Sequence, residues 1–186
     1  TKGRLAAEMI EKSKNQERLV SVFIKLENLI NEFAAVEQVT SSIALNNTKI
    51  CRIDDVIDEA LDIAMVDPGQ VTISKLEDVN LNADFKLLAI AAKNMIDNAL
   101  KYSPNKHVNI TITRESIKFI NEGERLSKEL RHYVEPFTKG ESAQKSFGLG
   151  LYIVENIIKA HKLTLSYEYK NGLNVFSFEN LQNIAA

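Results

Sequence analysis

The sequence predicts an α+β protein, in which a helical hairpin that is half of a dimeric four-helix bundle precedes an α/β sandwich with helices packed on a mixed sheet. Three observations predict this. The first 45 residues contain no proline and place apolar residues at intervals of three and four. Later stretches repeat this helical periodicity. Between them lie alternating apolar and polar runs joined by turn residues, which are typical of β-hairpins.

The first helical stretch carries the spacing of a helix in a bundle or coiled coil. Its repeat consists of Leu19, Val22, Leu26, Leu29, Phe33, Val36 and Ile43, with Thr40 in one slot. Phe23 and Ile30 widen the stripe, which favours a bundle over a two-stranded seam. Residues 5–10 indicate the end of an earlier helix. Two short helices cannot bury these stripes alone, so a homodimer is expected, with a hairpin packed on its own C-terminal domain as the alternative.

A polar break at residues 46–48 separates the hairpin from a second domain. The expected division is a hairpin at 1–47, a linker at 48–52 and the second domain at 53–181. The second domain's helices are expected at 53–64, 85–102 and 149–159, and its strands at 71–76, 108–112, 117–119, 163–169 and 173–178. Asn171-Gly172 stands between the last two strands, and this dipeptide is a strong signal for a two-residue hairpin turn.

Charge and composition narrow the possible partners and compartments. The net charge is −2, whereas nucleic-acid binders carry a basic surplus, so no nucleic-acid partner is expected. The single cysteine, Cys51, cannot form a disulfide within the chain, which favours a reducing compartment. No apolar run approaches the roughly 20 residues of a membrane span. Any membrane segment is therefore expected outside this sequence.

The helix expected at 85–102 has a polar stripe beside its apolar one. Asn94, Asn98 and Lys101 lie one turn apart on this stripe. Amide oxygens suit a hard cation such as Mg²⁺, and a lysine one turn further can meet a phosphate. Tyr102 can lie against a flat base. A solvated face of a surface helix is the alternative interpretation.

Two glycines precede the helix expected at 149–159. Gly148 and Gly150 lack side chains, so backbone N–H groups can approach phosphates closely at a helix N-terminus. A plain turn before a helix is the alternative. Upstream, Asn121 follows a strand and can accept a hydrogen bond from an adenine amino group, while Gly123 lets the backbone pass close to the ring. Here the alternative is a simple turn.

The loop at residues 133–140 carries an aromatic residue, Phe137, among polar residues. Phe137 can anchor a mobile lid, and Lys139 and Lys145 can meet phosphates once the lid closes.

Taken in order, these segments resemble the four nucleotide-binding boxes of sensor histidine kinases. Residues 94–102 resemble the N box, 121–123 the G1 box, 135–137 the F box and 148–151 the G2 box. Residues 1–10 are similar to the stretch that follows the phosphoacceptor histidine in osmosensor-type kinases. The resemblance spans nearly the whole chain. It implies a dimerisation and phosphotransfer hairpin followed by an ATP-binding domain of the gyrase, Hsp90 and histidine kinase superfamily.

The resemblance also implies roles for individual residues, with ATP and Mg²⁺ as cofactors. Asn98 is implied as the Mg²⁺ ligand, with Asn94 assisting, and Asn94 and Lys101 are implied as catalytic. The implied nucleotide-binding residues are Asn94, Asn98, Lys101, Tyr102, Asn121, Gly123, Phe137, Lys139, Gly148, Leu149 and Gly150. Phosphoryl transfer would go to a histidine missing from this sequence and then to a response regulator. The implied location is the cytoplasmic portion of a bacterial inner-membrane sensor protein.

The sequence departs from the family pattern at the adenine-binding segment. Asn121 stands in place of the usual aspartate, and Arg125 in place of the second glycine. A dimeric signalling scaffold with a degenerate, non-catalytic nucleotide site is therefore the alternative function. An ATP hydrolase is disfavoured, because Asn94 cannot act as a base.

None of the histidines in the sequence matches the phosphoacceptor position of the family. They are His107, His132 and His161, and all three are expected on the surface or in loops.

Overall fold

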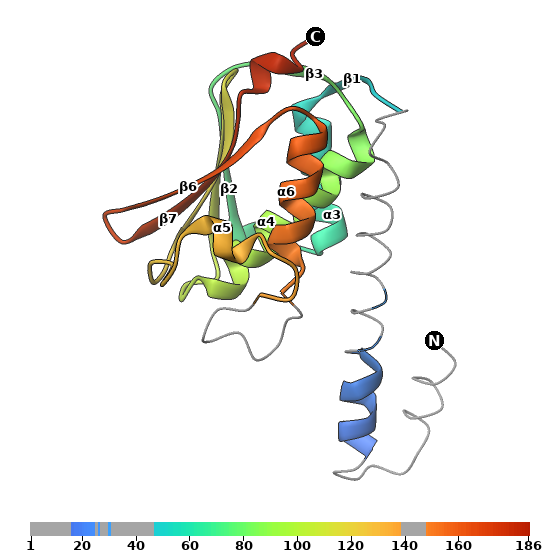
Figure 1. Cartoon of the computed structure of the whole chain (residues 1–186), viewed down its shortest axis with the longest axis vertical. Helices are drawn as coiled ribbons and strands as arrows, with labels where there is room; N and C mark the ends of the chain where they lie inside the picture. The colour runs from blue at the N-terminus through green and yellow to red at the C-terminus, as the bar shows by residue number, and fades with distance from the viewer. Residues whose placement is uncertain (1–15, 25, 27–29, 31–46, 139–147) are drawn as a thin grey trace. The chain divides into compact units, whose positions relative to one another are not determined.

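A computed structural model describes residues 16–24, 26, 30, 47–138 and 148–186 (Figure 1). The chain divides into two compact units, Thr1–Gln38 and Val39–Ala186. In the first unit the described residues are helical, and the apolar side chains Leu19, Val22, Leu26 and Ile30 are 43–62% exposed. The later positions of the predicted repeat, from Leu29 and Phe33 onwards, and the helix expected near 5–10 lie outside the described residues. The bundle, its dimer and the boundary at residue 47 therefore stay predictions.

The second unit is built on a mixed five-stranded sheet in the order β2–β4–β5–β7–β6. β2 (Val71–Lys75) runs parallel to β4 (Val108–Ile112), and all other neighbours are antiparallel. The remaining strands are β5 (Ser116–Glu122), β6 (Thr164–Lys170) and β7 (Leu173–Glu179). The helices α3 (Ile53–Ala64), α4 (Phe85–Tyr102) and α6 (Gly150–Ala160) cover one face (Figure 1). This arrangement confirms the predicted α/β sandwich.

Helix α4 begins and ends where its periodicity predicts. The Asp84 carboxylate accepts a hydrogen bond of 3.1 Å from the N–H of Leu87, which caps the helix start. Leu88, Ala92 and Met95, spaced by three and four residues, are at most 2% exposed. The apolar stripe therefore holds α4 in the core and leaves the stripe of Asn94 and Asn98 on another side. No helix in the described part of the chain has the length and hydropathy of a membrane span.

The core between sheet and helices is centred on two aromatic rings. Phe119 of β5 and Phe178 of β7 are 0% and 1% exposed, and their ring centroids lie 5.1 Å apart in an edge-to-face arrangement. The hairpin of β6 and β7 turns at Asn171 and Gly172, which both have positive φ, at 54° and 81°. These angles fit the type I′ turn that the dipeptide predicts.

A second sheet has two strands, and one of them lies in the stretch where the sequence predicts a linker. β1 (Lys49–Arg52) pairs antiparallel with β3 (Asn80–Ala83), and Ala185 forms a bridge to Leu81 of β3. Residues 49–52 are thus part of the folded unit. These strands have only four residues each, and their partners lie some thirty positions away. The local alternation is therefore too short to be detected in the sequence. The short helices η1 (Pro68–Gln70), α5 (Leu130–Tyr133) and η2 (Leu181–Asn183) complete the described elements.

His161 lies in the turn directly after α6, which fits the expected loop position, but its side chain is 1% exposed and is therefore not on the surface. Its ring connects two helices at their ends. Nδ1 donates to the carbonyl of Ile157 in α6 at 2.8 Å, and Nε2 accepts from the backbone N–H of Asp84, which precedes α4, at 3.0 Å. This pair of hydrogen bonds requires the neutral ring with its proton on Nδ1. Burial lowers the pKa of His161, opposed by the Ile157 carbonyl and the charge of Asp84.

The depressed pKa of His161 predicts a loss of stability in mild acid. Below the ordinary value of 6.5 the unfolded chain binds a proton that the folded chain does not, so the free energy of unfolding falls as the pH falls from there towards the folded pKa. His161→Gln keeps an acceptor for the Asp84 N–H without titrating. Urea unfolding between pH 5 and 7.5 should show a smaller decline for His161→Gln than for the natural chain. Equal declines would contradict the assignment.

Candidate functional site

The polar face of α4 lies against the start of α6. A Cβ added to Gly150 would lie 3.6 Å from Oδ1 of Asn94 and 3.8 Å from Nδ2 of Asn98. Nδ2 of Asn94 donates to the carbonyl of Ile90 at 3.0 Å, which fixes the amide orientation. The structure thus brings the two amides and Gly150 together, although they lie more than fifty positions apart in the sequence. The first N–H groups of α6 have no acceptor within the helix itself, and Leu149 provides no side-chain cap.

The second predicted glycine, Gly148, lies against the loop that leads out of α5. A Cβ there would lie 2.2 Å from the carbonyl oxygen of Thr138, and Gly148 has φ 75°. Only glycine fits this close approach in the left-handed region. Leu149, between the glycines, is 2% exposed, so its side chain belongs to the core and only its backbone can face a ligand.

The end of β5 packs against the end of α4. A Cβ on Gly123 would lie 3.1 Å from the carbonyl oxygen of Tyr102 and 3.0 Å from Nδ2 of Asn174. Asn121 is 4% exposed, and Tyr102 is 42% exposed. The segment predicted for adenine binding therefore meets the C-terminal end of the amide-bearing helix.

The remaining predicted residues are less enclosed. The Lys101 ammonium lies 4.8 Å from the centroid of the Tyr102 ring, so these neighbours form a cation–π pair. Phe137 is 66% exposed with φ 62°, so its ring is not anchored in the described core. Lys139 and Lys145 lie outside the described residues.

Asn174 of β7 is a site residue that the sequence did not single out. It pairs directly with Asn121 across the strands and is 5% exposed. The Asn-Gly turn sets the β6–β7 register, but the pairing of β7 with β5 bridges some fifty residues. The signal available in the sequence was that Asn121 and Asn174 are polar residues at the ends of two otherwise apolar alternating runs.

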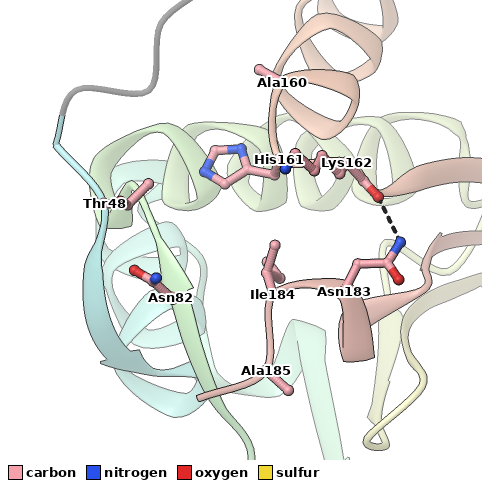
Figure 2. A pocket seen from close by; sticks show the side chains of 8 residues that line it. All are labelled: Thr48, Asn82, Ala160, His161, Lys162, Asn183, Ile184 and Ala185. Carbon is pink, nitrogen blue, oxygen red and sulfur yellow. Dashed lines mark hydrogen bonds between the residues drawn. The ribbon is translucent and has the colours of Figure 1, made fainter.

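A cavity of about 250 Å³ lies at the opposite end of α6 from the glycines. Figure 2 shows its lining, which comprises Thr48, Asn82, Ala160, His161, Lys162, Asn183, Ile184 and Ala185. Eleven helical residues span about 16 Å, so this cavity is separate from the amide and glycine site.

Two glycines at a helix start beside two amide side chains form an arrangement suited to binding phosphate groups. Comparison with known proteins agrees. The family model of histidine kinase-, DNA gyrase B- and HSP90-like ATPases matches residues 83–181.

The relatives that match include a sensor histidine kinase and a heme sensor protein. Sensor histidine kinase ArsS of Helicobacter pylori is 32% identical over 184 residues, covering 97% of this chain and 43% of that protein. The heme sensor protein HssS of Staphylococcus epidermidis is 35% identical over 115 residues, covering 58% of this chain and 26% of that protein. The structure of Acinetobacter baumannii histidine kinase AdeS matches with a TM-score of 0.68 at 20% identity, covering 97% of this chain and 92% of that one, and supports the fold.

The chain therefore belongs to the histidine kinase-, DNA gyrase B- and HSP90-like ATPase family, and over 97% of its length it is similar to a sensor histidine kinase. It spans less than half the length of the curated relatives described above.

Proposed function

We propose that the second unit binds Mg-ATP and that its γ-phosphoryl group is transferred to a histidine outside this sequence, for relay to a response regulator. The observation that carries the proposal is the approach of Gly150 to the amides of Asn94 and Asn98. It places amide groups beside a helix start that has unpaired N–H groups. A triphosphate fits between the two, since one side offers oxygen to its cation and the other offers N–H groups to its oxygens.

The residues present fit Mg²⁺ held jointly with phosphates. The described residues contain no group of three or more His, Cys, Asp or Glu side chains that could hold a metal by themselves. Mg²⁺ is commonly bound by one or two protein oxygens together with substrate phosphates. Asn98 would supply the ligand, and Asn94, whose Nδ2 is already engaged by Ile90, would assist. When bound, the ion neutralises charge on the transferring phosphoryl group.

The protein's own contribution is positioning and charge. Lys101 would leave the Tyr102 ring to meet a phosphate, and Tyr102 and Gly123 would border the base. The backbone from Gly148 through Leu149 to Gly150 would cradle the phosphates, with Phe137 and Lys139 on the covering loop. Asn94 has no basic group with which to activate water, which suits transfer to a protein nucleophile better than hydrolysis.

The first unit would provide the dimer and the docking site for the response regulator. The exposed stripe of Leu19, Val22, Leu26 and Ile30 supports this, because an isolated helix leaves those side chains in water. The described part would then lie on the cytoplasmic side of a membrane sensor.

Asn98→Ala tests the metal assignment. We expect Mg²⁺ to strengthen ATP binding to the natural chain, and Asn98→Ala to weaken binding in Mg²⁺ by about 10–100-fold, as loss of a metal-site contact does. Asn109→Ala, an exposed asparagine of β4, is the matched control and should bind as the natural chain does. Titration calorimetry with and without EDTA measures both. No binding at millimolar ATP would overturn the nucleotide proposal, and persistent Mg²⁺ dependence in Asn98→Ala would overturn the ligand assignment.

Labelling with γ-³²P-ATP separates the kinase from a non-catalytic scaffold. A longer chain that supplies an acceptor histidine should acquire acid-labile and base-stable phosphate. Firm ADP binding without any labelling would instead favour the scaffold, which the neutral Asn121 at the base-binding segment motivates.

A further inference from the structure

Two buried asparagines, Asn121 and Asn174, lie at one end of the sheet face that the helices cover. Along β5 and β7 the paired residues on this face are Ile117 with Phe178, then Phe119 with Phe176, and finally Asn121 with Asn174. The last pair is 4% and 5% exposed. Buried amide groups are costly unless hydrogen-bonded, so their partners need to be accounted for.

Asn174 is oriented by a relay from the neighbouring strand. The Tyr167 hydroxyl donates to Oδ1 of Asn174 at 2.8 Å, and its oxygen accepts from the backbone N–H of Leu126 at 3.0 Å. Because Leu126 supplies the donor, the Tyr167 proton is directed to Asn174. Tyr167 also packs on Phe176, with ring centroids 4.8 Å apart, which limits its movement. Oδ1 of Asn174 is thus fixed as the engaged atom.

Among the described residues, the amide nitrogen of Asn174 has no hydrogen-bond partner. Within residues 47–138 and 148–186, no group accepts a hydrogen bond from Nδ2, which faces the backbone of Gly123. In Asn121 the oxygen is the atom without a partner: Nδ2 donates to the carbonyl of Glu122 at 2.7 Å, and Oδ1 accepts from no described group. The pair presents one buried donor and one buried acceptor beside the segment proposed to bind the base.

We propose that Asn174 recognises the base: its Nδ2 donates to a ring-nitrogen acceptor of adenine, while Asn121 accepts from the adenine amino group. The hydrogen bond from Tyr167 to Asn174 then makes this site select adenine over guanine. This rests on the proposed nucleotide site. At the same base position guanine presents a ring N–H and a carbonyl oxygen, which are the reverse of adenine's groups. An amide free to rotate could serve either base, whereas Tyr167 prevents Asn174 from rotating. Adenine selection then needs no charged side chain.

The test is the ratio of ATP to GTP affinity, measured by calorimetry on the whole chain with Mg²⁺. For the natural chain we expect ATP to be preferred. Tyr167→Phe, which releases the amide, should lower the preference about tenfold while changing ATP affinity less, on the scale of one neutral hydrogen bond. Tyr169→Phe removes a hydroxyl from the same strand, without any described hydrogen bond, and should match the natural chain.

Asn174→Asp gives a second test with a nearly unchanged shape. Its carboxylate only accepts, so ATP should bind about tenfold more weakly or worse, and the preference should shift towards GTP. Circular dichroism checks that each variant folds. An unchanged ratio in Tyr167→Phe, or unchanged affinities in Asn174→Asp, would overturn this inference while leaving ATP binding intact. Failure of the natural chain to bind either nucleotide would instead overturn the proposed function.

Discussion

Replacing Phe119 by alanine should lower the free energy of unfolding of the second unit by about 3–5 kcal/mol. Phe119 is 0% exposed and makes the edge-to-face contact with Phe178 at 5.1 Å. Its removal loses the burial of a large apolar surface and leaves a cavity between sheet and helices that close-packed neighbours cannot fill. Since a natural domain is stable by about 5–15 kcal/mol, this is a large share. Urea unfolding followed by circular dichroism measures it, as the chain has no tryptophan.

Phe137→Ala is the matched control for the core prediction. The same chemical change at a side chain that is 66% exposed should alter the free energy of unfolding by less than about 0.5 kcal/mol. If the two variants lose similar stability, or if Phe119→Ala loses less than Phe137→Ala, Phe119 is not the centre of the core.

Gly148→Ala should disrupt the close packing of Gly148 on the Thr138 backbone just before α6. The added Cβ would lie 2.2 Å from the Thr138 carbonyl oxygen, so backbone must move, and φ 75° strains any side chain by a further 1–3 kcal/mol, roughly. We expect ATP affinity to fall by about tenfold or more, because each 1.4 kcal/mol lost from the arrangement costs a factor of ten. Calorimetry and thermal unfolding together measure the effect.

Gly150→Ala provides the comparison within the same motif. Its Cβ would meet Asn94 and Asn98 at 3.6 Å or more, which is ordinary contact, and alanine favours the helix that starts there. Thermal stability should therefore be kept in Gly150→Ala and lost in Gly148→Ala. Equal stability of the two variants would contradict the close packing of Gly148 on Thr138.

The helices could be predicted from the sequence because their patterns are local. The stretch 53–64 and the stretch 85–102 coincide with α3 and α4, since an apolar face repeats through each. β1 and β3 escaped prediction because four residues hold too little alternation and their pairing is long-range. The burial of His161 has the same origin, since its partner Asp84 lies 77 positions away.

The sequence predicted those site residues that belong to recognisable motifs, namely asparagines with amide side chains and glycines that expose the backbone. Asn94, Asn98, Gly148 and Gly150 were singled out, and the structure brings Gly150 beside both amides. Asn174 was missed because only the register of β5 with β7 places it opposite Asn121. The relay through Tyr167 could not be foreseen either, as it depends on a backbone N–H after the end of β5.

The contact between Thr138 and Gly148 has a consequence for how well the protein tolerates changes in chain length. Gly148 packs closely against the backbone of Thr138, so these two residues, ten positions apart in the sequence, are held together by the fold itself. Doubling the length of such a loop costs only about 0.6 kcal/mol of closure entropy. Insertions between these two residues should therefore be tolerated by the domain. The number of residues between Thr138 and Gly148 can then vary while the amide helix, the glycine turn and the buried asparagine row stay as they are.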